Sequence, residues 1–200
     1  MSSWKPNFDP DHLYFVTTQA VDYLHIFQRD VIKRIVLDAF DSFRLRKRMK
    51  LYSFVIMPNH IHFTGQFTKD DPLSDVMRDF KKHTSDRILR QLKAEDNTDT
   101  LKILAEKVTR PEKQTYKVWE DDYNAKDVFS VEFLEQKMEY IHYNPCREHW
   151  KLSATPEAYL WSSARFYLTE EPCIIPIDDV REALLVQSGS DDPDQREKPN

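Results

Sequence analysis

Two histidines separated by one residue, His60 and His62, are the side chains of this chain best placed to bind a metal. In an extended strand, alternate side chains point to the same face, so both imidazoles would project together. Two residues of strand rise separate their Cα atoms by about 7 Å, and at that spacing both rings can reach one divalent cation. Two half-buried histidines on a strand would give the same pattern, because a single H-x-H pair is a weak signal.

A second group of polar side chains lies in the sequence YIHYNP, where Tyr140 and Asn144 are four residues apart. On a helix, residues with this spacing are neighbours on one face. A phenol can attack phosphorus when it loses its proton and a metal neutralises the phosphate. The carboxamide oxygen of Asn144 is a hard metal ligand, and two imidazoles beside it favour manganese or zinc over magnesium. A half-buried helix aromatic would explain an isolated tyrosine equally well.

Patterns of apolar residues place both groups on a short series of elements. Extended segments are predicted at residues 13–21, 51–57, 60–67 and 115–120. Helices are predicted at residues 29–50, from a cap at Asp71 with Pro72 at the first helical position to Leu92, and from a cap at Ser130 to Pro145. The first six elements follow the split βαβ order. We therefore predict an α+β, ferredoxin-like fold: an antiparallel sheet with two helices on one face, plus a C-terminal helix that carries Tyr140.

The pattern predicts one domain with flexible ends. Residues 12–168 form the domain, with an insertion or loop at 94–114 that holds a short helix at 101–108. Residues 1–11 are polar and contain two prolines, so we expect a flexible arm. Residues 169–200 are rich in acidic residues and are expected to form a largely disordered tail. The chain has two glycines, which excludes a glycine-rich phosphate loop.

Composition excludes several classes of protein. Of the 200 residues, 40% are hydrophobic and 32% are charged, which is typical of a globular domain. No run approaches the roughly 20 apolar residues of a membrane helix, and the N-terminus lacks a secretory pattern. Two cysteines, Cys146 and Cys173, are too few for a disulfide framework. We therefore expect a cytoplasmic protein.

The net charge of −5 lies entirely in residues 171–200, so residues 1–170 are neutral, with 26 charges of each sign. Local basic faces then decide whether a polyanion can bind. Basic residues gather at the end of the first helix and along the second: Arg44, Arg46, Lys47, Arg48, Lys81, Lys82 and Arg87. They are either solvated helix faces or phosphate contacts, and we expect the acidic tail to compete with a polyanion for them.

Three motifs in a fixed order give the chain a family resemblance. PNHIHF at 58–63, YIHYNP at 140–145 and YLWSSARFY at 159–167 resemble the motifs of single-tyrosine HUH transposases. Within that superfamily the chain looks most like the REP-associated tyrosine transposases of bacteria, over about residues 12–168. The resemblance implies a ferredoxin-like fold that acts on single-stranded DNA. A tyrosine cleaves the strand, forms a 5′-phosphotyrosine link and frees a 3′-hydroxyl.

Matched position by position, the resemblance assigns roles to four residues. It makes His60 and His62 ligands of Mg²⁺ or Mn²⁺, Asn144 the third protein ligand, and Tyr140 the nucleophile. It implies a single-stranded or hairpin substrate of the REP type, bound at the nucleoid in the bacterial cytoplasm, with no membrane partner. It leaves open whether the protein is a monomer or a homodimer.

Several points stay open at this stage. Tyr143 is a rival nucleophile within one turn of Tyr140, and His142 either orients a phosphate or packs in the core. After Trp119, where relatives often carry a histidine, this chain reads EDDYNAKDVF, so no role is transferred there. Two other functions fit the motifs less well: a metal phosphoesterase in which water attacks, and a catalytically silent module that binds hairpin DNA.

Overall fold

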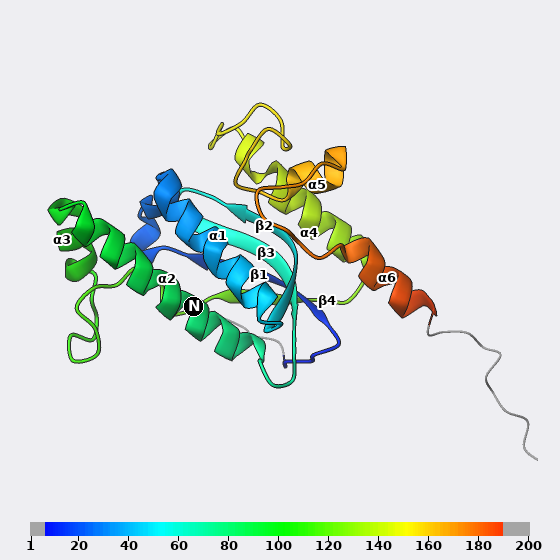
Figure 1. Ribbon diagram of the computed structural model, residues 1–200, viewed down its shortest axis with the longest axis horizontal. Coiled ribbons are helices and arrows are strands. Elements are labelled where there is room, and N and C mark those ends of the chain that lie inside the picture. Colours follow the sequence, from blue (N-terminus) through cyan, green and yellow to red (C-terminus); the bar gives the residue numbers. More distant parts are fainter. Residues whose placement is uncertain (1–6, 190–200) are drawn as a thin grey trace, which may run out of the picture.

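The computed structural model describes residues 7–189 (Figure 1). These residues contain a four-stranded antiparallel sheet in the order β2-β3-β1-β4. The strands are β1 (Leu13–Gln19), β2 (Met49–Ile56), β3 (His60–Phe67) and β4 (Asn124–Val128). A helix follows β1 and another follows β3, as the split βαβ plan requires. The predicted α+β fold is confirmed.

Helices α1 (Asp30–Leu45) and α2 (Leu73–Ala94) cover one face of the sheet (Figure 1). The ring of Phe40 on α1 lies 5.2 Å from that of Phe63 on β3 and 4.9 Å from that of Phe80 on α2. This aromatic cluster joins the two helices to the sheet. The short helix α3 (Thr98–Glu106) packs against the end of α2.

Helix α4 (Val131–Tyr143) lies on the opposite face. Side chains alternate along β3, so His62 points away from the face on which Phe63 meets α1. The ring of Tyr140 on α4 contacts His62, which places α4 on that second face. Ser130 caps the helix as predicted, because its Oγ accepts a hydrogen bond of 3.2 Å from the Phe133 N–H. A 3₁₀ turn at Asn144–Cys146 ends it.

The predicted strand at residues 115–120 is wrong. That segment forms a single isolated bridge, between Trp119 and Ala20 just after β1, and the centroid of the Trp119 ring lies 4.6 Å from that of Phe27. Val118 and Trp119 are buried in the core instead of forming part of a ladder. The fourth strand is β4, whose Asn, Lys and Asp residues have low strand propensity but suit a sheet edge.

The first helix is shorter than predicted. It ends at Leu45 rather than Lys50, because Lys47 adopts a left-handed backbone with φ of 57° that turns the chain. Strand β2 already begins at Met49. Part of the predicted basic cluster therefore lies in a tight turn.

The second helix begins one residue later than predicted. It starts at Leu73, with Pro72 at the N-cap position, and Asp71 does not cap it. The Asp71 carboxylate instead accepts a hydrogen bond of 2.6 Å from Arg48. The predicted short helix within 94–114 exists as α3, three residues nearer the N-terminus than expected.

The segment after α4 covers the outer edge of β2. Strand edges carry unpaired backbone groups that favour aggregation unless another segment pairs with them. Here three backbone hydrogen bonds of 2.8 to 3.0 Å join β2 to that segment: Ile56 N to Trp161 O, Ser163 N to Phe54 O, and Asp178 N to Leu51 O. The side chain of Asp178 also accepts a bond of 2.9 Å from the Leu51 N–H.

This arrangement corrects the expectation of a largely disordered tail after residue 169. Helix α5 (Ala164–Thr169) leads to a stretch in which Ile175 and Val180 are buried, followed by α6 (Val180–Gly189). Residues 190–200, like 1–6 of the predicted arm, lie outside the described residues. Within residues 7–189, no helix combines the length and apolar character needed to cross a lipid bilayer.

His142 fixes α4 to the covering segment. It is 4% exposed, and its Nε2 lies 3.0 Å from Ser163 Oγ, which in turn accepts a hydrogen bond from Phe54 N–H on β2. Burial lowers the pKa of His142 to about 4. This residue therefore packs in the core, the second of the two roles considered from the sequence.

The pairing of β2 with the segment after α4 predicts that two neighbouring aspartates contribute unequally to the free energy of unfolding. Asp178→Ala leaves the Leu51 N–H without its side-chain partner and should lower the free energy of unfolding by about 1–3 kcal/mol. Asp179→Ala removes an ion pair with Arg181 and an exposed hydrogen bond of 2.9 Å from the Arg181 N–H, and should cost about 0.5–1 kcal/mol. Urea unfolding followed by circular dichroism measures both. Equal losses in the two variants would contradict the role assigned to Asp178.

Because His142 is buried, we expect the protein to lose stability in mild acid. The unfolded chain binds a proton near pH 6.5 but the buried imidazole does not, so stability is full above pH 6.5 and falls as the pH approaches 4. Between pH 7 and pH 5 this residue alone should cost about 2 kcal/mol. Urea unfolding of His142→Gln should show a pH dependence weaker by that amount, whereas a variant of the exposed His83, His83→Gln, should match the wild type. An unchanged slope in His142→Gln would contradict the assignment.

Candidate active site

His60 and His62 open β3 on the face that α1 and α2 leave uncovered. Their ring centroids are 4.6 Å apart, with an angle of 73° between the rings. The chain bends at Pro58 and Asn59 just before β3 begins. Both imidazoles therefore project from the first three residues of the strand. The structure brings the two predicted ligands together.

Hydrogen bonds at Nδ1 orient both rings. His60 Nδ1 donates to Asn59 Oδ1 at 2.6 Å, and His62 Nδ1 lies 2.7 Å from Thr17 Oγ1 on the neighbouring β1 strand. The contact with Asn59 fixes the tautomer of His60, and in both rings the occupied Nδ1 leaves Nε2 as the atom that can ligate a metal. The Nε2 atom of His62 is buried and has no hydrogen-bond partner among the described residues. A buried polar atom without a partner is costly, and a metal ion would satisfy it.

Both imidazoles are neutral at physiological pH. Burial lowers the pKa of His60 to about 4, and the nearby His149 adds to this shift. Burial also holds the pKa of His62 well below its usual range, with His60 and Arg147 adding to the effect. The neutral imidazole carries the lone pair that a metal ion needs. The site is thus ready to bind a cation without first releasing protons.

Tyr140 lies against this pair. Its ring centroid is 5.0 Å from that of His62, at an angle of 72°, and 6.0 Å from that of Phe15 on β1. The guanidinium of Arg147 lies over the tyrosine ring, with its central carbon 4.6 Å from the centroid. The rival Tyr143 is 47% exposed and points to solvent at the end of α4. Tyr140 is therefore the tyrosine that meets the histidines.

Asn144 ends α4 one turn after Tyr140 and is 2% exposed. Among residues 7–189 its side chain is therefore largely removed from solvent. Within the same residues, no three His, Cys, Asp or Glu side chains come together to hold a metal. A cation at the two histidines therefore needs a ligand of another type, and the buried carboxamide of Asn144 is a candidate.

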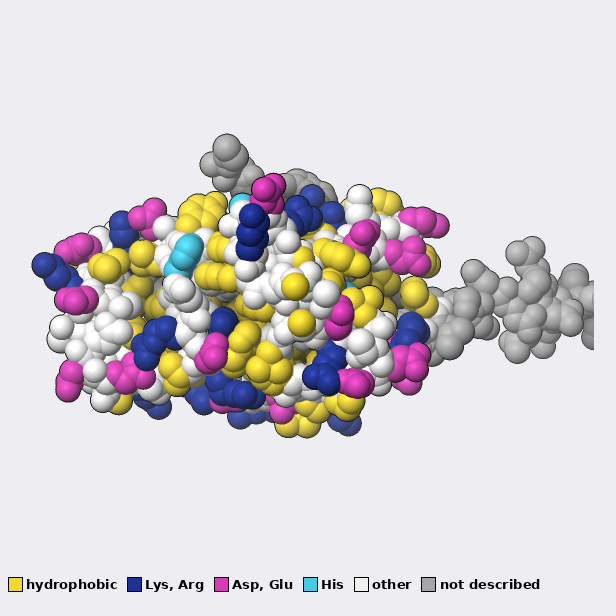
Figure 2. Space-filling view, turned by 90° about the horizontal axis from the view of Figure 1, so that it is seen from above, with side chains coloured by type: hydrophobic (Ala, Val, Ile, Leu, Met, Phe, Trp, Pro, Cys, Tyr) yellow, Lys and Arg dark blue, Asp and Glu magenta, His cyan; other side chains and the backbone are white. Residues whose placement is uncertain are grey.

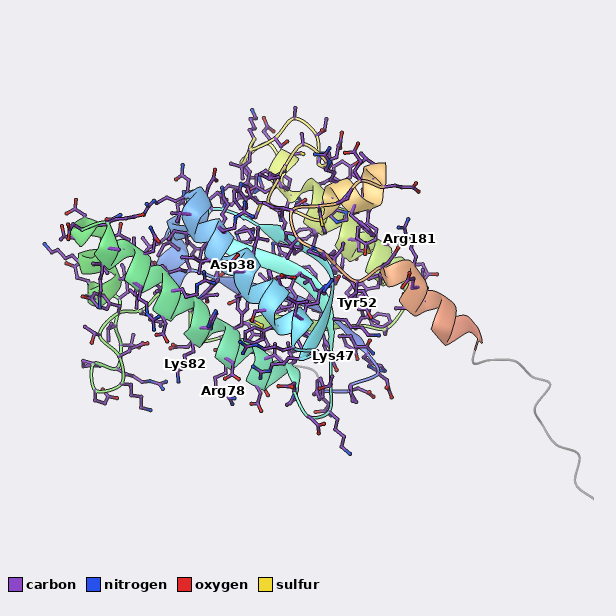
Figure 3. The ribbon with its side chains drawn as sticks, viewed as in Figure 1. Asp38, Lys47, Tyr52, Arg78, Lys82 and Arg181 are labelled. Atoms are coloured by element: carbon purple, nitrogen blue, oxygen red, sulfur yellow. The ribbon has the colours of Figure 1, made fainter. Side chains whose placement is uncertain are left out.

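The predicted DNA-contacting residues lie on the other side of the sheet, on or beside α1 and α2. Most of them are engaged by acidic or carbonyl oxygens: Arg48 with Asp71 and Asp79, Arg87 with Asp38, Arg44 with Asp178, and Lys81 with the carbonyls of residues 120–122. Arg46, Lys47 and Lys82 are exposed, and Figure 3 shows Lys82 on the side of α2 that faces away from α1. On the face that Figure 2 shows, basic and acidic side chains are interspersed and form no single basic patch.

Three other cations lie near Tyr140, and the sequence did not single them out. Arg147 follows the 3₁₀ turn, Lys137 precedes Tyr140 by one helical turn, and Lys126 lies opposite Phe15 in the β1–β4 register. The ammonium of Lys137 lies 5.5 Å from the centroid of the Phe15 ring. The spacing of Lys137 from Tyr140 was a usable signal, but the position of Lys126 depends on a strand that the sequence did not predict.

A small open pocket lies beside the nucleophile candidate. Its volume is about 340 Å³, and it is lined by Gln136, Lys137, Glu139, Tyr140, Tyr143 and Arg147. The pocket carries two cations and one carboxylate. Its position next to Tyr140 gives an anionic substrate a route to the phenol.

Comparison with known proteins identifies a family and a shared fold. The family model described as "Transposase IS200 like" matches residues 11–144, which include both histidines, Tyr140 and Asn144. A solved structure of a REP-associated tyrosine transposase bound to a REP hairpin shares 14% identity, with a TM-score of 0.57 over 89% of this chain and 93% of that one. A candidate transposase from Deinococcus radiodurans R1 shares 17% identity, with a TM-score of 0.42 over 70% of this chain and 95% of that one. No curated protein matches.

The family model covers about two thirds of the chain, from before β1 to the end of α4. The solved REP-associated transposase shares the fold over nearly the whole length of both chains. The resemblance that the three sequence motifs indicated is therefore confirmed. The chain belongs to the IS200-like family of single-tyrosine HUH transposases, enzymes that act on single-stranded DNA.

Proposed function

We propose that this protein cleaves and rejoins single-stranded DNA through a covalent link to Tyr140. The observation that carries the proposal is the contact between the Tyr140 ring and His62, whose buried Nε2 has no hydrogen-bond partner among the described residues. A phenol beside a nitrogen that can ligate a metal is the pairing that phosphoryl transfer to tyrosine requires. Residues about eighty positions apart in sequence supply it.

The reaction is a transesterification. The Tyr140 hydroxyl oxygen attacks the scissile phosphorus and its proton passes to solvent, while the bond from phosphorus to the 3′-oxygen breaks and that oxygen takes up a proton. One phosphodiester is exchanged for another, so no energy source is consumed and the reverse attack by a 3′-hydroxyl rejoins the strand. Phe15 and His62 restrict the tyrosine ring, which limits the orientations of the phenol.

Membership of the family implies a divalent metal, and the residues present fit one. His60 and His62 offer Nε2 atoms, and Asn144 offers a buried carboxamide oxygen. When bound, Mg²⁺ or Mn²⁺ would polarise the phosphodiester and offset its charge. Two imidazole ligands favour Mn²⁺ of the two.

The proposed substrate is a hairpin with a flanking single strand, of the REP type, in bacterial DNA. Support comes from the shared fold with the transposase solved on a REP hairpin. The exposed Arg46, Lys47 and Lys82 remain candidate contacts for the hairpin backbone, because they form no ion pair within the described residues. The paired Arg48 and Arg87 would have to exchange a carboxylate for a phosphate.

Trapping of the covalent intermediate tests the proposal. Incubation with a labelled hairpin oligonucleotide and Mn²⁺, followed by denaturing electrophoresis, should show a protein–DNA adduct in the wild type. Tyr140→Phe should abolish the adduct and cleavage, because no other side chain supplies the attacking oxygen. Tyr143→Phe, the matched control one turn away, should retain the adduct.

Other outcomes separate the remaining functions. Cleavage that persists in Tyr140→Phe without an adduct would mean that water attacks, as in a metal phosphoesterase. Hairpin binding without cleavage in the wild type would mean a binding module. Transfer of the adduct to Tyr143 would reject Tyr140 as the nucleophile.

Metal binding is testable without activity. A ligand that binds only the folded state at about 100 times its Kd adds about 2.7 kcal/mol, which raises the Tm of a domain of this size by roughly 5–10 °C. Mn²⁺ should produce such a rise in the wild type, and EDTA should reverse it. His62→Ala should lose most of this rise in Tm. The control variant His83→Ala, at an exposed position on α2, should keep it. An undiminished rise in His62→Ala would reject the site.

A further inference from the structure

Arg147 is an unpaired guanidinium next to the reactive residue. It is exposed and forms no ion pair with residues 7–189, and its contact is with the face of the Tyr140 ring. Its charge also reaches the site, since it helps to lower the pKa of His62. Other arginines of this protein, such as Arg48 and Arg87, have carboxylate partners. A guanidinium without an acid, beside a nucleophile for phosphate, is a phosphate-binding group.

Lys137 lies on the same side of α4, one turn before Tyr140. Its ammonium sits over the rings of Phe15 and Phe133, at 5.5 and 4.7 Å from their centroids, and no carboxylate pairs with it in the described residues. Burial lowers its pKa, and the neighbouring Lys126 adds to this shift. Two cations held close together without an acid between them repel each other, and a bound anion relieves that repulsion.

Together these residues define one surface. Lys137 and Arg147 line the same pocket of about 340 Å³, on either side of Tyr140 along the chain. Glu139 also lines this pocket, and Lys126 lies on the adjoining edge strand. The cations outnumber the acid, so the surface suits a chain of phosphates rather than a single neutral ligand.

We propose that Arg147 and Lys137 form a phosphate-binding pocket for the DNA strand, in which Arg147 holds the scissile phosphate and Lys137 holds a neighbouring phosphate. The proposal rests on the proposed function, because it assigns positions to the strand that Tyr140 cleaves. Arg147 donates N–H groups to the non-bridging oxygens and transfers no proton, since its guanidinium stays charged. It stabilises the charge that develops at phosphorus during the exchange of the two ester bonds.

The roles of the two cations predict different kinetic effects. Arg147→Ala should lower the single-turnover cleavage rate at saturating hairpin DNA by about 10²–10³-fold, because it removes one donor from the transition state. Arg147→Lys should recover part of the rate. Lys137→Gln should mainly weaken binding, and it should reduce the slope of log affinity against log salt by about 0.7, the share of one phosphate contact on a single strand.

A substrate with no charge at the scissile position separates loss of the Arg147 charge from structural damage caused by the substitution. With a methylphosphonate at the scissile position, the charge that Arg147 contacts is absent, so Arg147→Ala and the wild type should cleave at similar rates. Two exposed cations away from the site serve as controls, and Arg110→Ala and Lys102→Gln should behave as wild type on both substrates. Matching melting temperatures and a retained Mn²⁺ shift would show that the variants fold.

The results distinguish this proposal from the function on which it rests. If Tyr140→Phe abolishes the adduct while Arg147→Ala cleaves at the wild-type rate, the phosphate pocket is rejected and the nucleophile stands. An equal rate loss for Arg147→Ala on charged and neutral substrates would also reject it. If Tyr140→Phe retains the adduct, Tyr140 is not the nucleophile. Both the proposed function and the phosphate pocket are then rejected.

Discussion

One stretch of α4 meets two different neighbours. Tyr140 packs on His62 at the sheet face, and His142, two residues later, is buried against Ser163 in the segment that covers β2. Because consecutive helix residues point about 100° apart, these contacts fix the helix both in rotation and along its axis. The geometry of the candidate site therefore depends on a hydrogen bond on the other side of the helix, made by a residue that takes no part in the chemistry.

The same burial that positions the histidines also sets their chemistry. Thr17 and Asn59 occupy the Nδ1 atoms, and the surrounding core removes water, so the imidazoles stay uncharged and their Nε2 atoms stay available. Leaving the buried Nε2 of His62 without a protein partner costs stability in the metal-free chain. Such a cost is expected where a protein keeps a polar atom for a ligand rather than for its own fold.

Local patterns were enough to predict the strands of the two histidines, the Ser130 cap and the helix that carries Tyr140, since each depends on residues a few positions apart. The partners of charged side chains were not predictable in this way. Arg48 pairs with residues 23 and 31 positions away, and Arg87 with one 49 positions away. Strand β4 escaped prediction for a related reason, because its pairing with β1 outweighs the weak strand propensity of its residues.

Charge pairing also explains how a neutral domain can bind a polyanion. On the layer of α1 and α2, carboxylates neutralise much of the basic surface, so less positive potential remains there to attract a polyanion. Around Tyr140, Lys126, Lys137 and Arg147 have no such partners among the described residues, and their positive potential stays available to a phosphate. Net charge cannot show this difference, because it sums both layers. What matters for a substrate strand is which cations the fold leaves unpaired, and among the described residues these include the three near Tyr140.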